Sequence, residues 1–286
     1  MKRAIQSYQY QDYAGMFSRS VFTDVLKYGD CSAFDRMISL YGGRSFSSYM
    51  DYLSYLYKEI SKHYRCEYVY KNELIKKAIA KHFRHNDTVA FNEFRAGDSI
   101  VDIALFNGES RAFEIKTEYD STKRLDKQLK DYSSIFQRCY VVVPSEEKDF
   151  YESYLSENVG IVLLSRDRGR IRLVEYRAAQ KNESIDPHVL MSTLRTQEYK
   201  NIVQNYYGRV PDVSCFEMYK ACEALLGGIP AERLASEFIG QVKRRKGLIN
   251  ELDQCPECLR QMCLSMNLKH EEVNNIITTL SNPITY

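Results

Sequence analysis

Residues 99–117 read SIVDIALFNGESRAFEIKT, and apolar side chains alternate with other residues on both sides of a central Asn107-Gly108. A period of two is typical of β-strands, so SIVDIALF and RAFEIKT predict two antiparallel strands. A two-residue turn would put the apolar sets of the two strands on opposite faces of the hairpin. A three-residue turn with Gly108 in the left-handed conformation puts them on one face, and we therefore expect an odd loop.

In that register the hairpin has one apolar face and one face that carries charged side chains. The residues expected to cover the core are Val101, Ile103, Leu105, Phe113 and Ile115. Asp102, Glu114 and Lys116 then converge on the opposite face. The same alternation is typical of a strand with one solvated face, so the spacing alone does not separate a site from a wet surface.

Two carboxylates and a lysine at this spacing have a definite chemistry. Asp102 and Glu114 offer the hard oxygen ligands that Mg²⁺ or Mn²⁺ prefers, and the backbone carbonyl of Ile115 offers another. A metal held there polarises a phosphate and lowers the pKa of bound water. Lys116 can orient that water or stabilise charge on phosphorus. Because two carboxylates without a metal repel each other, we expect replacement of either one to cost little stability.

The flanking sequence predicts a helix over 67–83, strands at 88–94, 99–106 and 111–117, a helix over 121–137 and a strand at 139–144. A further helix and two strands follow, which complete an α-β-β-β-α-β order with additions. Gln128 and Tyr132 lie four residues apart on the second helix and therefore share a face. Gln128 has both an amide donor and an acceptor to direct toward the site.

This order, with Asp102, Glu114-Ile115-Lys116 and Gln128-xxx-Tyr132 within it, resembles the PD-(D/E)xK restriction-endonuclease-like superfamily. Residues 64–144 resemble a small, poorly characterised bacterial branch, with Val101 in place of the proline that precedes the motif aspartate. The resemblance implies an α/β fold with a restriction-endonuclease-like mixed β-sheet core. It also implies catalytic roles for Asp102, Glu114, Lys116 and Gln128, with Tyr132 in support.

The implied function is a nuclease that uses Mg²⁺ or Mn²⁺ to hydrolyse phosphodiester bonds, in DNA, with a role in bacterial defence or mobile-element biology. The alternative is a nucleic-acid-binding or adaptor protein that reuses the fold without cutting. Members of the superfamily often recruit a glutamate from the first helix. Glu67 lies on the flank of the apolar face of helix 67–83 with Lys71, whereas Glu73 points away from that face. We therefore expect Glu67 to be a metal ligand supported by Lys71, with Glu93 as a weaker third carboxylate.

The chain divides by pattern into an N-terminal helical region (1–64), a nuclease-like core (65–177) and a C-terminal helical region (187–286). The C-terminal region is expected to pack as its own layer, to complete no sheet, and to bind a protein partner or a second copy. The formal net charge is only +2, so a nucleic-acid site must be a local basic patch. The candidate phosphate-binding residues are Lys123, Arg124, Lys243, Arg244, Arg245 and Lys246; for the last four, a solvated helix end is the competing interpretation.

The stretch CPECLRQMC, residues 255–263, contains a CxxC pair that could open a zinc site, but no second pair accompanies it. The apolar residues Cys255, Cys258, Leu259, Met262, Cys263 and Met266 follow helical spacing, which favours a buried helix stripe. Eight scattered cysteines and the lack of a signal peptide or an uninterrupted apolar span indicate a cytoplasmic protein without membrane association.

Overall fold

The computed structural model describes residues 2–85, 88–167, 170–245 and 252–284. The chain forms two compact units. The first contains Met1–Asn86, Leu164–Leu173 and Leu248–Tyr286, and the second contains Asp87–Leu163 and Val174–Gly247. Each of the predicted ranges 65–177 and 187–286 is split between the two units, because the helix at 67–85 and the helices at 260–265 and 270–280 pack with the N-terminal helices.

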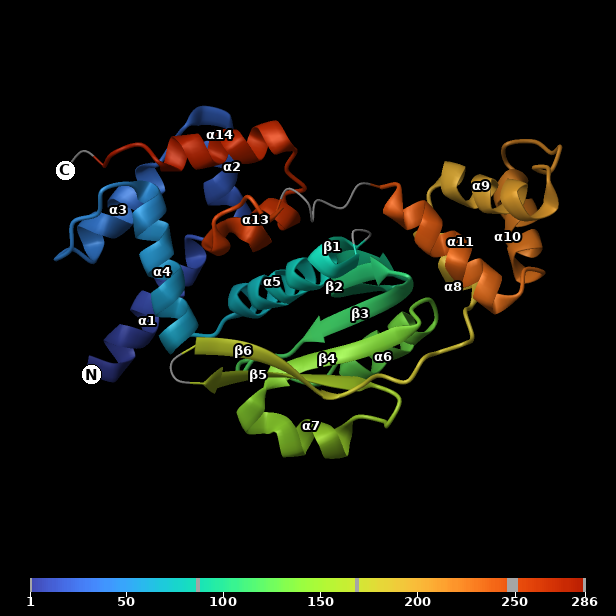
Figure 1. Ribbon diagram of the computed structural model, residues 1–286, viewed down its shortest axis with the longest axis horizontal. Helices are drawn as coiled ribbons and strands as arrows, with labels where there is room; N and C mark the ends of the chain where they lie inside the picture. The colour runs from blue at the N-terminus through green and yellow to red at the C-terminus, as the bar shows by residue number, and fades with distance from the viewer. Residues whose placement is uncertain (1, 86–87, 168–169, 246–251, 285–286) are drawn as a thin grey trace. The chain divides into compact units, whose positions relative to one another are not determined.

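A mixed six-stranded sheet is the centre of the fold, with its strands in the order β1-β2-β3-β4-β5-β6 (Figure 1). The strands are β1 (Val89–Ala96), β2 (Ser99–Asn107), β3 (Glu109–Ile115), β4 (Arg138–Pro144), β5 (Gly160–Asp167) and β6 (Arg170–Arg177). β1, β2 and β3 pair antiparallel, and β4 is parallel to β3. The parallel step requires a crossover, which α6 (Leu125–Ser133) supplies. The predicted order of elements is therefore present as α5-β1-β2-β3-α6-β4.

The β2–β3 hairpin has the predicted odd loop. The register pairs Ile103 with Phe113 and Asn107 with Glu109, which leaves Gly108 alone at the tip. Gly108 has a φ of 67°, the left-handed conformation that glycine adopts without the steric cost of a side chain. Continued by one position, this register places Asp102 opposite Glu114, so the predicted phase of the two strands is confirmed.

The expected separation into an apolar and a charged face is only partly correct. Val101 does not lie with Ile103 and Leu105 but joins a cluster on the other face, and Leu105 is half-buried. This cluster includes Phe94, Ala104, Phe106 and Ala112, so the face that carries Asp102 and Glu114 is itself largely apolar. The strands are buried on both faces, which alternation alone does not reveal.

An irregularity in β1 accounts for the change of face. Phe91 and Phe94 are three residues apart, yet their ring centroids lie 5.7 Å apart and both rings contact Phe106. Between them, Glu93 has a φ of 56°, a left-handed conformation that is rare for a side-chain-bearing residue inside a strand. The register places Glu93 opposite Asp102. Backbone irregularities of this kind re-aim side chains beside functional sites.

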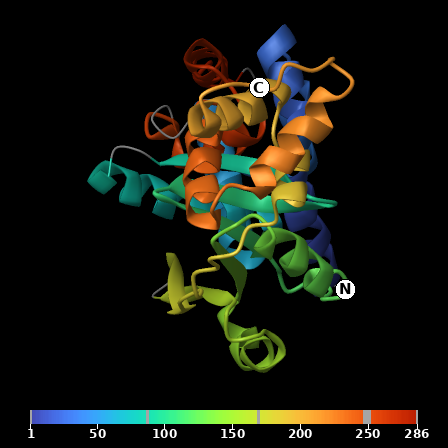
Figure 2. The ribbon, with the colours of Figure 1, turned by 90° about the vertical axis from the view of Figure 1, so that its right-hand side faces the viewer.

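Helices of the C-terminal region cover this face of the sheet (Figure 2). They are α8 (Pro187–Thr193), α9 (Thr196–Tyr207), α10 (Met218–Gly227) and α11 (Ala231–Lys243). α8 begins at Pro187 because the Asp186 side chain accepts the backbone N–H groups of His188 and Val189 at 2.9 and 3.3 Å. As predicted, these helices add no strand to the sheet within the described residues, but the layer they form ends at α11, because Leu248–Tyr286 belongs to the first unit. They share one core with the sheet.

A second apolar cluster of the same unit lies around β4. It joins Val141 and Val143 of β4 to Leu125 at the start of α6 and to Tyr151 of α7 (Lys148–Tyr154), which follows the short turn η1 (Ser145–Glu147). β4 is thus buried along its length, as its continuous apolar run predicts.

Apart from the parts of β5 and β6 within Leu164–Leu173, the first unit is helical. Its elements are α1 (Lys2–Gly15), α2 (Arg19–Tyr28), α3 (Ser32–Leu40), α4 (Tyr49–His63), α5 (Glu67–His85), the 3₁₀ turn η2 (Glu257–Leu259), α13 (Arg260–Ser265) and α14 (His270–Leu280). α13 packs on α5, and α14 packs on α2 and α4. The cysteine-rich stripe is buried as expected, but the helix is shorter than predicted because Pro256 opens a 3₁₀ turn before Arg260.

Glu73 corrects the helical projection used for α5. It is buried at 8% exposure, and its carboxylate accepts a hydrogen bond from the Tyr57 hydroxyl at 3.3 Å. Burial raises its pKa above the ordinary value, although Lys76 opposes that shift. Residues 69–75 of α5 are all buried, so the helix has no solvated side there for Glu73 to face. Every helix within the described residues is too short or too polar to span a lipid bilayer.

Candidate functional site

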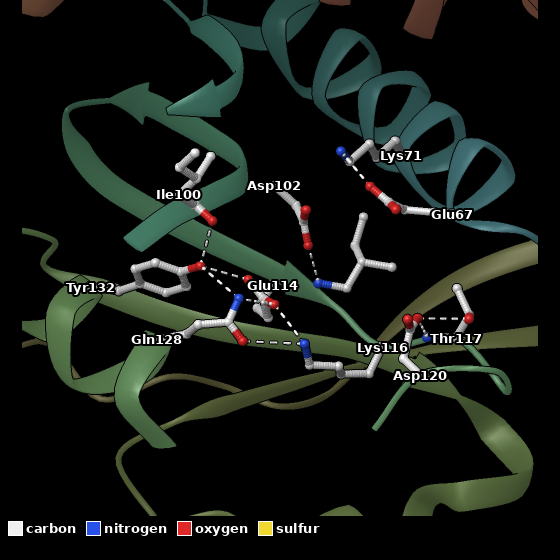
Figure 3. Close-up of polar contacts among 11 residues, drawn as sticks. Glu67, Lys71, Ile100, Asp102, Glu114, Lys116, Thr117, Asp120, Gln128 and Tyr132 are labelled. Carbon is white, nitrogen blue, oxygen red and sulfur yellow. Dashed lines mark hydrogen bonds and ion pairs between the residues drawn. The ribbon is translucent and has the colours of Figure 1, made fainter. Parts of the chain in front are cut away.

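Asp102 lies where the two strands of the hairpin separate. The printed pairing of β2 with β3 ends at Ile103 and Phe113. The next backbone N–H on that edge of β3, from Ile115, donates to Oδ2 of Asp102 at 2.8 Å (Figure 3). A side-chain carboxylate thus holds the position that a β2 carbonyl would take in a continued ladder. The carbonyl of Ile115 lies on the same edge of β3 as its N–H.

Glu114 is the centre of a buried polar network at only 2% exposure. Its Oε1 accepts hydrogen bonds from Lys116 Nζ at 2.7 Å and from Gln128 Nε2 at 2.6 Å, and its Oε2 accepts one from the Tyr132 hydroxyl at 2.7 Å (Figure 3). The Gln128 carbonyl oxygen accepts a second hydrogen bond from Lys116 at 3.2 Å. Lys116 itself is 8% exposed. The predicted meeting of Glu114 and Lys116 with the Gln128–Tyr132 face of α6 is present.

Tyr132 fixes the orientation of the carboxylate. Its hydroxyl lies 2.7 Å from both Glu114 Oε2 and the backbone carbonyl of Ile100, and its single proton can serve one acceptor at a time. Burial and the negative charges of Glu114 and Asp102 raise the pKa of Tyr132 far above its ordinary value. The phenol therefore stays protonated and acts as a donor to the site.

The donor set around Asp102 and Glu114 suits a hard divalent cation. Among the residues that the structure describes, no three His, Cys, Asp or Glu side chains are grouped to hold a metal ion. Mg²⁺ does not need such a cage, since it is usually bound by one or two carboxylates, several waters and substrate phosphate. Two carboxylates with the Ile115 carbonyl on the same strand edge meet that requirement. The residues present therefore fit the expected metal.

Two features of the site escape the sequence pattern. Asp120 holds the loop after Lys116, because its Oδ2 accepts hydrogen bonds from the backbone N–H and the hydroxyl of Thr117 at 2.8 and 2.7 Å. These two hydrogen bonds hold the turn that leads from the lysine toward α6. Glu93, expected as a third carboxylate, is exposed on β1 at the position opposite Asp102. The T-x-x-D spacing of Thr117 and Asp120 could have indicated the loop, whereas nothing in the sequence indicates the backbone conformation of Glu93.

Glu67 and Lys71 lie one turn apart on α5, in the first unit. Their side chains form an ion pair with an N–O distance of 2.5 Å; the Lys71 side chain is 6% exposed and that of Glu67 is 55% exposed. Glu67 and Lys71 therefore lie together on one flank of α5, as predicted. The role of Glu67 as a metal ligand stays a prediction.

The basic residues expected to meet phosphate are not equivalent. Lys123 and Arg124 are exposed directly before α6, and Arg244 is exposed after α11. Lys243 is half-buried, and Lys246 lies outside the described residues.

Arg245 is not available to phosphate, which corrects the prediction. Its guanidinium donates to both carboxylate oxygens of Glu198, with the Nε–Oε1 bond at 2.6 Å, and it lies over the Phe94 ring. Both side chains of the pair are 11% exposed. Although burial acts in the opposite direction, the hydrogen bond from Arg245 lowers the pKa of Glu198. Arg245 therefore joins α11 to α9 inside the core.

Comparison with known proteins gives one family. Residues 61–254 match the sequence profile of the family described as bacteriophage P4 protein cII, a range that includes every candidate site residue from Glu67 to Arg245. Protein cII of Enterobacteria phage P4 is 26% identical over 180 residues, which are 63% of this chain and 64% of that protein. The chain thus covers less than two thirds of that relative. A solved protein of unknown function from Silicibacter pomeroyi aligns with 50% of this chain and 94% of its own, at 19% identity and a TM-score of 0.30.

Proposed function

The chain belongs to the bacteriophage P4 protein cII family, and we propose that this member is a divalent-metal-dependent nuclease that hydrolyses phosphodiester bonds in DNA. One observation carries the proposal. A lysine and two carboxylates meet where β2 and β3 separate, and a glutamine and a tyrosine from α6 hold one of those carboxylates in place. A fold needs no such arrangement for stability, because an apolar substitute of similar volume is often at least as stable as a buried ion pair.

In this proposal Asp102, Glu114 and the Ile115 carbonyl hold Mg²⁺ or Mn²⁺. The bound cation supplies the charge that polarises the scissile phosphate and lowers the pKa of a water ligand. Lys116 has a further N–H beyond those given to Glu114 and Gln128, and this N–H can donate a hydrogen bond that orients the attacking water or stabilises charge on a phosphate oxygen. Gln128 and Tyr132 keep the Glu114 carboxylate from rotating, so the ligand is preorganised.

The same proposal assigns the α5-β1-β2-β3-α6-β4 segment to a restriction-endonuclease-like core. The order of elements and the mixed sheet support that assignment. Lys123, Arg124 and Arg244 are the exposed cations that would meet the DNA backbone. We place the protein in the cytoplasm, in bacterial defence or mobile-element biology, a setting supported by a bacteriophage protein among its relatives.

A second candidate is a protein that binds nucleic acid without cutting it. The state of Glu114 favours this alternative, because three donors already engage its two oxygens and only 2% of the residue is exposed. To bind a metal, Glu114 would have to use the one carboxylate lone pair that accepts no hydrogen bond from these three donors. If it does not, the network is a structural element of a binding fold.

Cleavage assays separate the two candidates. The full chain is incubated with linear, circular and single-stranded DNA and with RNA, in Mg²⁺, in Mn²⁺ and in EDTA. The proposal predicts cleavage of DNA that EDTA abolishes and that Gln128→Ala slows by about ten- to a hundredfold, the range for groups that orient a metal ligand. Lys130→Ala, an exposed change on the same helix, is the matched control and should cut at the normal rate. Metal-independent binding without cleavage of any substrate would establish the alternative.

A further inference from the structure

The first unit contains a cavity that the nuclease proposal does not use. It has a volume of about 240 Å³ and lies among α1, α3, the loop after α3 and α4. Its aromatic walls are Tyr13, Tyr41, Phe46, Tyr52 and Tyr55. Protein interiors rarely keep spaces much larger than a water molecule. A volume slightly below the roughly 300–1,000 Å³ of small-molecule pockets suits a ligand of modest size.

The aromatic side chains that line the cavity pack against one another. The ring centroids of Tyr13 and Tyr41 are 5.4 Å apart in an edge arrangement, and those of Phe46 and Tyr52 are 5.0 Å apart. Gln9 on α1 donates a hydrogen bond to the Tyr13 hydroxyl at 2.6 Å, which fixes that ring. Rings held in this way present preformed faces, and a flat aromatic ligand can stack on them with little ordering cost.

One hydroxyl in the wall has no partner. Tyr52 is 3% exposed, and its hydroxyl makes no hydrogen bond with any residue that the structure describes. Buried hydroxyl groups are usually paired, because an unpaired one loses its hydrogen bonds to water. Burial raises the pKa of Tyr52 well above its ordinary value, so the group remains a donor. A ligand with an acceptor atom in the cavity would satisfy it.

The charged side chain that lines the cavity is a cation. Arg44 lines the cavity from the loop after α3, is exposed, and lies over the Tyr55 ring at 4.8 Å from its centroid. Arg44 is the one charged side chain among the described residues that line the cavity, and the Asp12 carboxylate outside the lining accepts a hydrogen bond from the Tyr41 hydroxyl. Gly43, with a φ of 106°, allows the backbone turn that precedes Arg44. Arg44 therefore gives the cavity one group that can bind an anion.

We propose that this cavity binds a nucleoside monophosphate, with the base between the tyrosine rings and the phosphate at Arg44. The base supplies the flat π-system and the acceptor for the Tyr52 hydroxyl, and the phosphate supplies the negative charge. The site is separate from Asp102 and Glu114 in the chain, and its occupation does not depend on nuclease activity.

Isothermal titration calorimetry of the full chain tests the proposal. AMP, GMP, CMP and UMP are titrated in EDTA, so that no divalent metal contributes, alongside adenosine, guanosine, cytidine, uridine and inorganic phosphate. At least one monophosphate should bind, and its nucleoside and free phosphate should each bind about tenfold more weakly or worse, since each lacks half of the contacts. Absence of binding by all four monophosphates at millimolar concentration would overturn the proposal. Inorganic phosphate binding as tightly as the nucleotides would do the same.

Two variants connect binding to the named residues. Arg44→Ala should weaken the nucleotide that binds by about ten- to a hundredfold, the range for a charge-assisted hydrogen bond, whereas the exposed Arg36→Ala should not. Tyr52→Phe should weaken the same nucleotide by about three- to tenfold. It should also raise the melting temperature of the free protein, because it removes an unpaired buried hydroxyl. Unchanged affinity in either cavity variant would refute the assignment.

Discussion

Replacing Glu114 with alanine is predicted to destabilise the second unit by about 3–5 kcal/mol, the usual cost of breaking one side of a buried ion pair. Glu114 and Lys116 lie 2.7 Å apart, with side-chain exposures of 3% and 10%. At this distance Coulomb's law with an effective dielectric constant of about 20 gives a gross attraction of about 6 kcal/mol. Desolvation of both groups offsets part of it in the intact pair. Without Glu114, the Lys116 ammonium keeps its desolvation cost and loses that attraction.

Urea denaturation followed by far-UV circular dichroism measures this change, with the transition of the second unit fitted separately if two are resolved. The double variant Glu114→Leu with Lys116→Met should recover more than half of the loss, because no buried charge remains. This expectation reverses the one drawn from the sequence, in which two repelling carboxylates made Glu114 dispensable for stability. A loss below about 1 kcal/mol in Glu114→Ala would refute the reasoning, since that is the range of exposed pairs.

Glu198→Gln should cost about 3 kcal/mol at pH 7, because Arg245 stays buried. The folded-state pKa of Glu198 is lowered. Its contribution is therefore complete above the unfolded pKa and lost as pH falls through the folded value, so wild-type and variant urea midpoints should converge as the pH is lowered below the ordinary range of a glutamate. Gly108→Ala should cost about 1–2 kcal/mol in the same assay through its positive φ, with no atom near the new Cβ, whereas Gly227→Ala should not destabilise. Arg244→Ala should reduce the slope of log affinity for duplex DNA against log salt by about 0.9 in gel-shift titrations; an unchanged slope would make this residue a solvated helix end.

The sequence predicts most of the site because its parts obey short-range rules. The phase of the β2–β3 hairpin follows from its alternation together with Asn107-Gly108, and the structure has that register. Gln128 and Tyr132 follow from the helical repeat of α6, and both reach Glu114. Each of these predictions needs only the geometry of one element or one turn.

The parts that escape prediction depend on partners distant in the chain. Arg245 belongs to a basic run, but its burial depends on Glu198, 47 residues earlier. Glu73 has a polar neighbourhood in sequence and a buried one in the fold, because α4 and the C-terminal segment cover α5. The change of face at Glu93 results from the positive φ of its backbone. A glutamate in a sequence does not indicate a positive φ, because residues with a side chain rarely adopt it.

The most direct test of the proposed nuclease is the single-turnover rate of DNA cleavage in Mg²⁺ or Mn²⁺ by the wild-type chain and by Asp102→Asn. Asparagine retains an oxygen that accepts the Ile115 N–H, so the fold should be preserved, as circular dichroism would verify. It removes the negative charge that a hard cation requires. The account predicts cleavage by the wild type and a rate below about one hundredth of it in the variant, as for loss of one essential electrostatic group. Cleavage by Asp102→Asn within twofold of the wild-type rate, or no cleavage by the wild type with any DNA substrate, would contradict it.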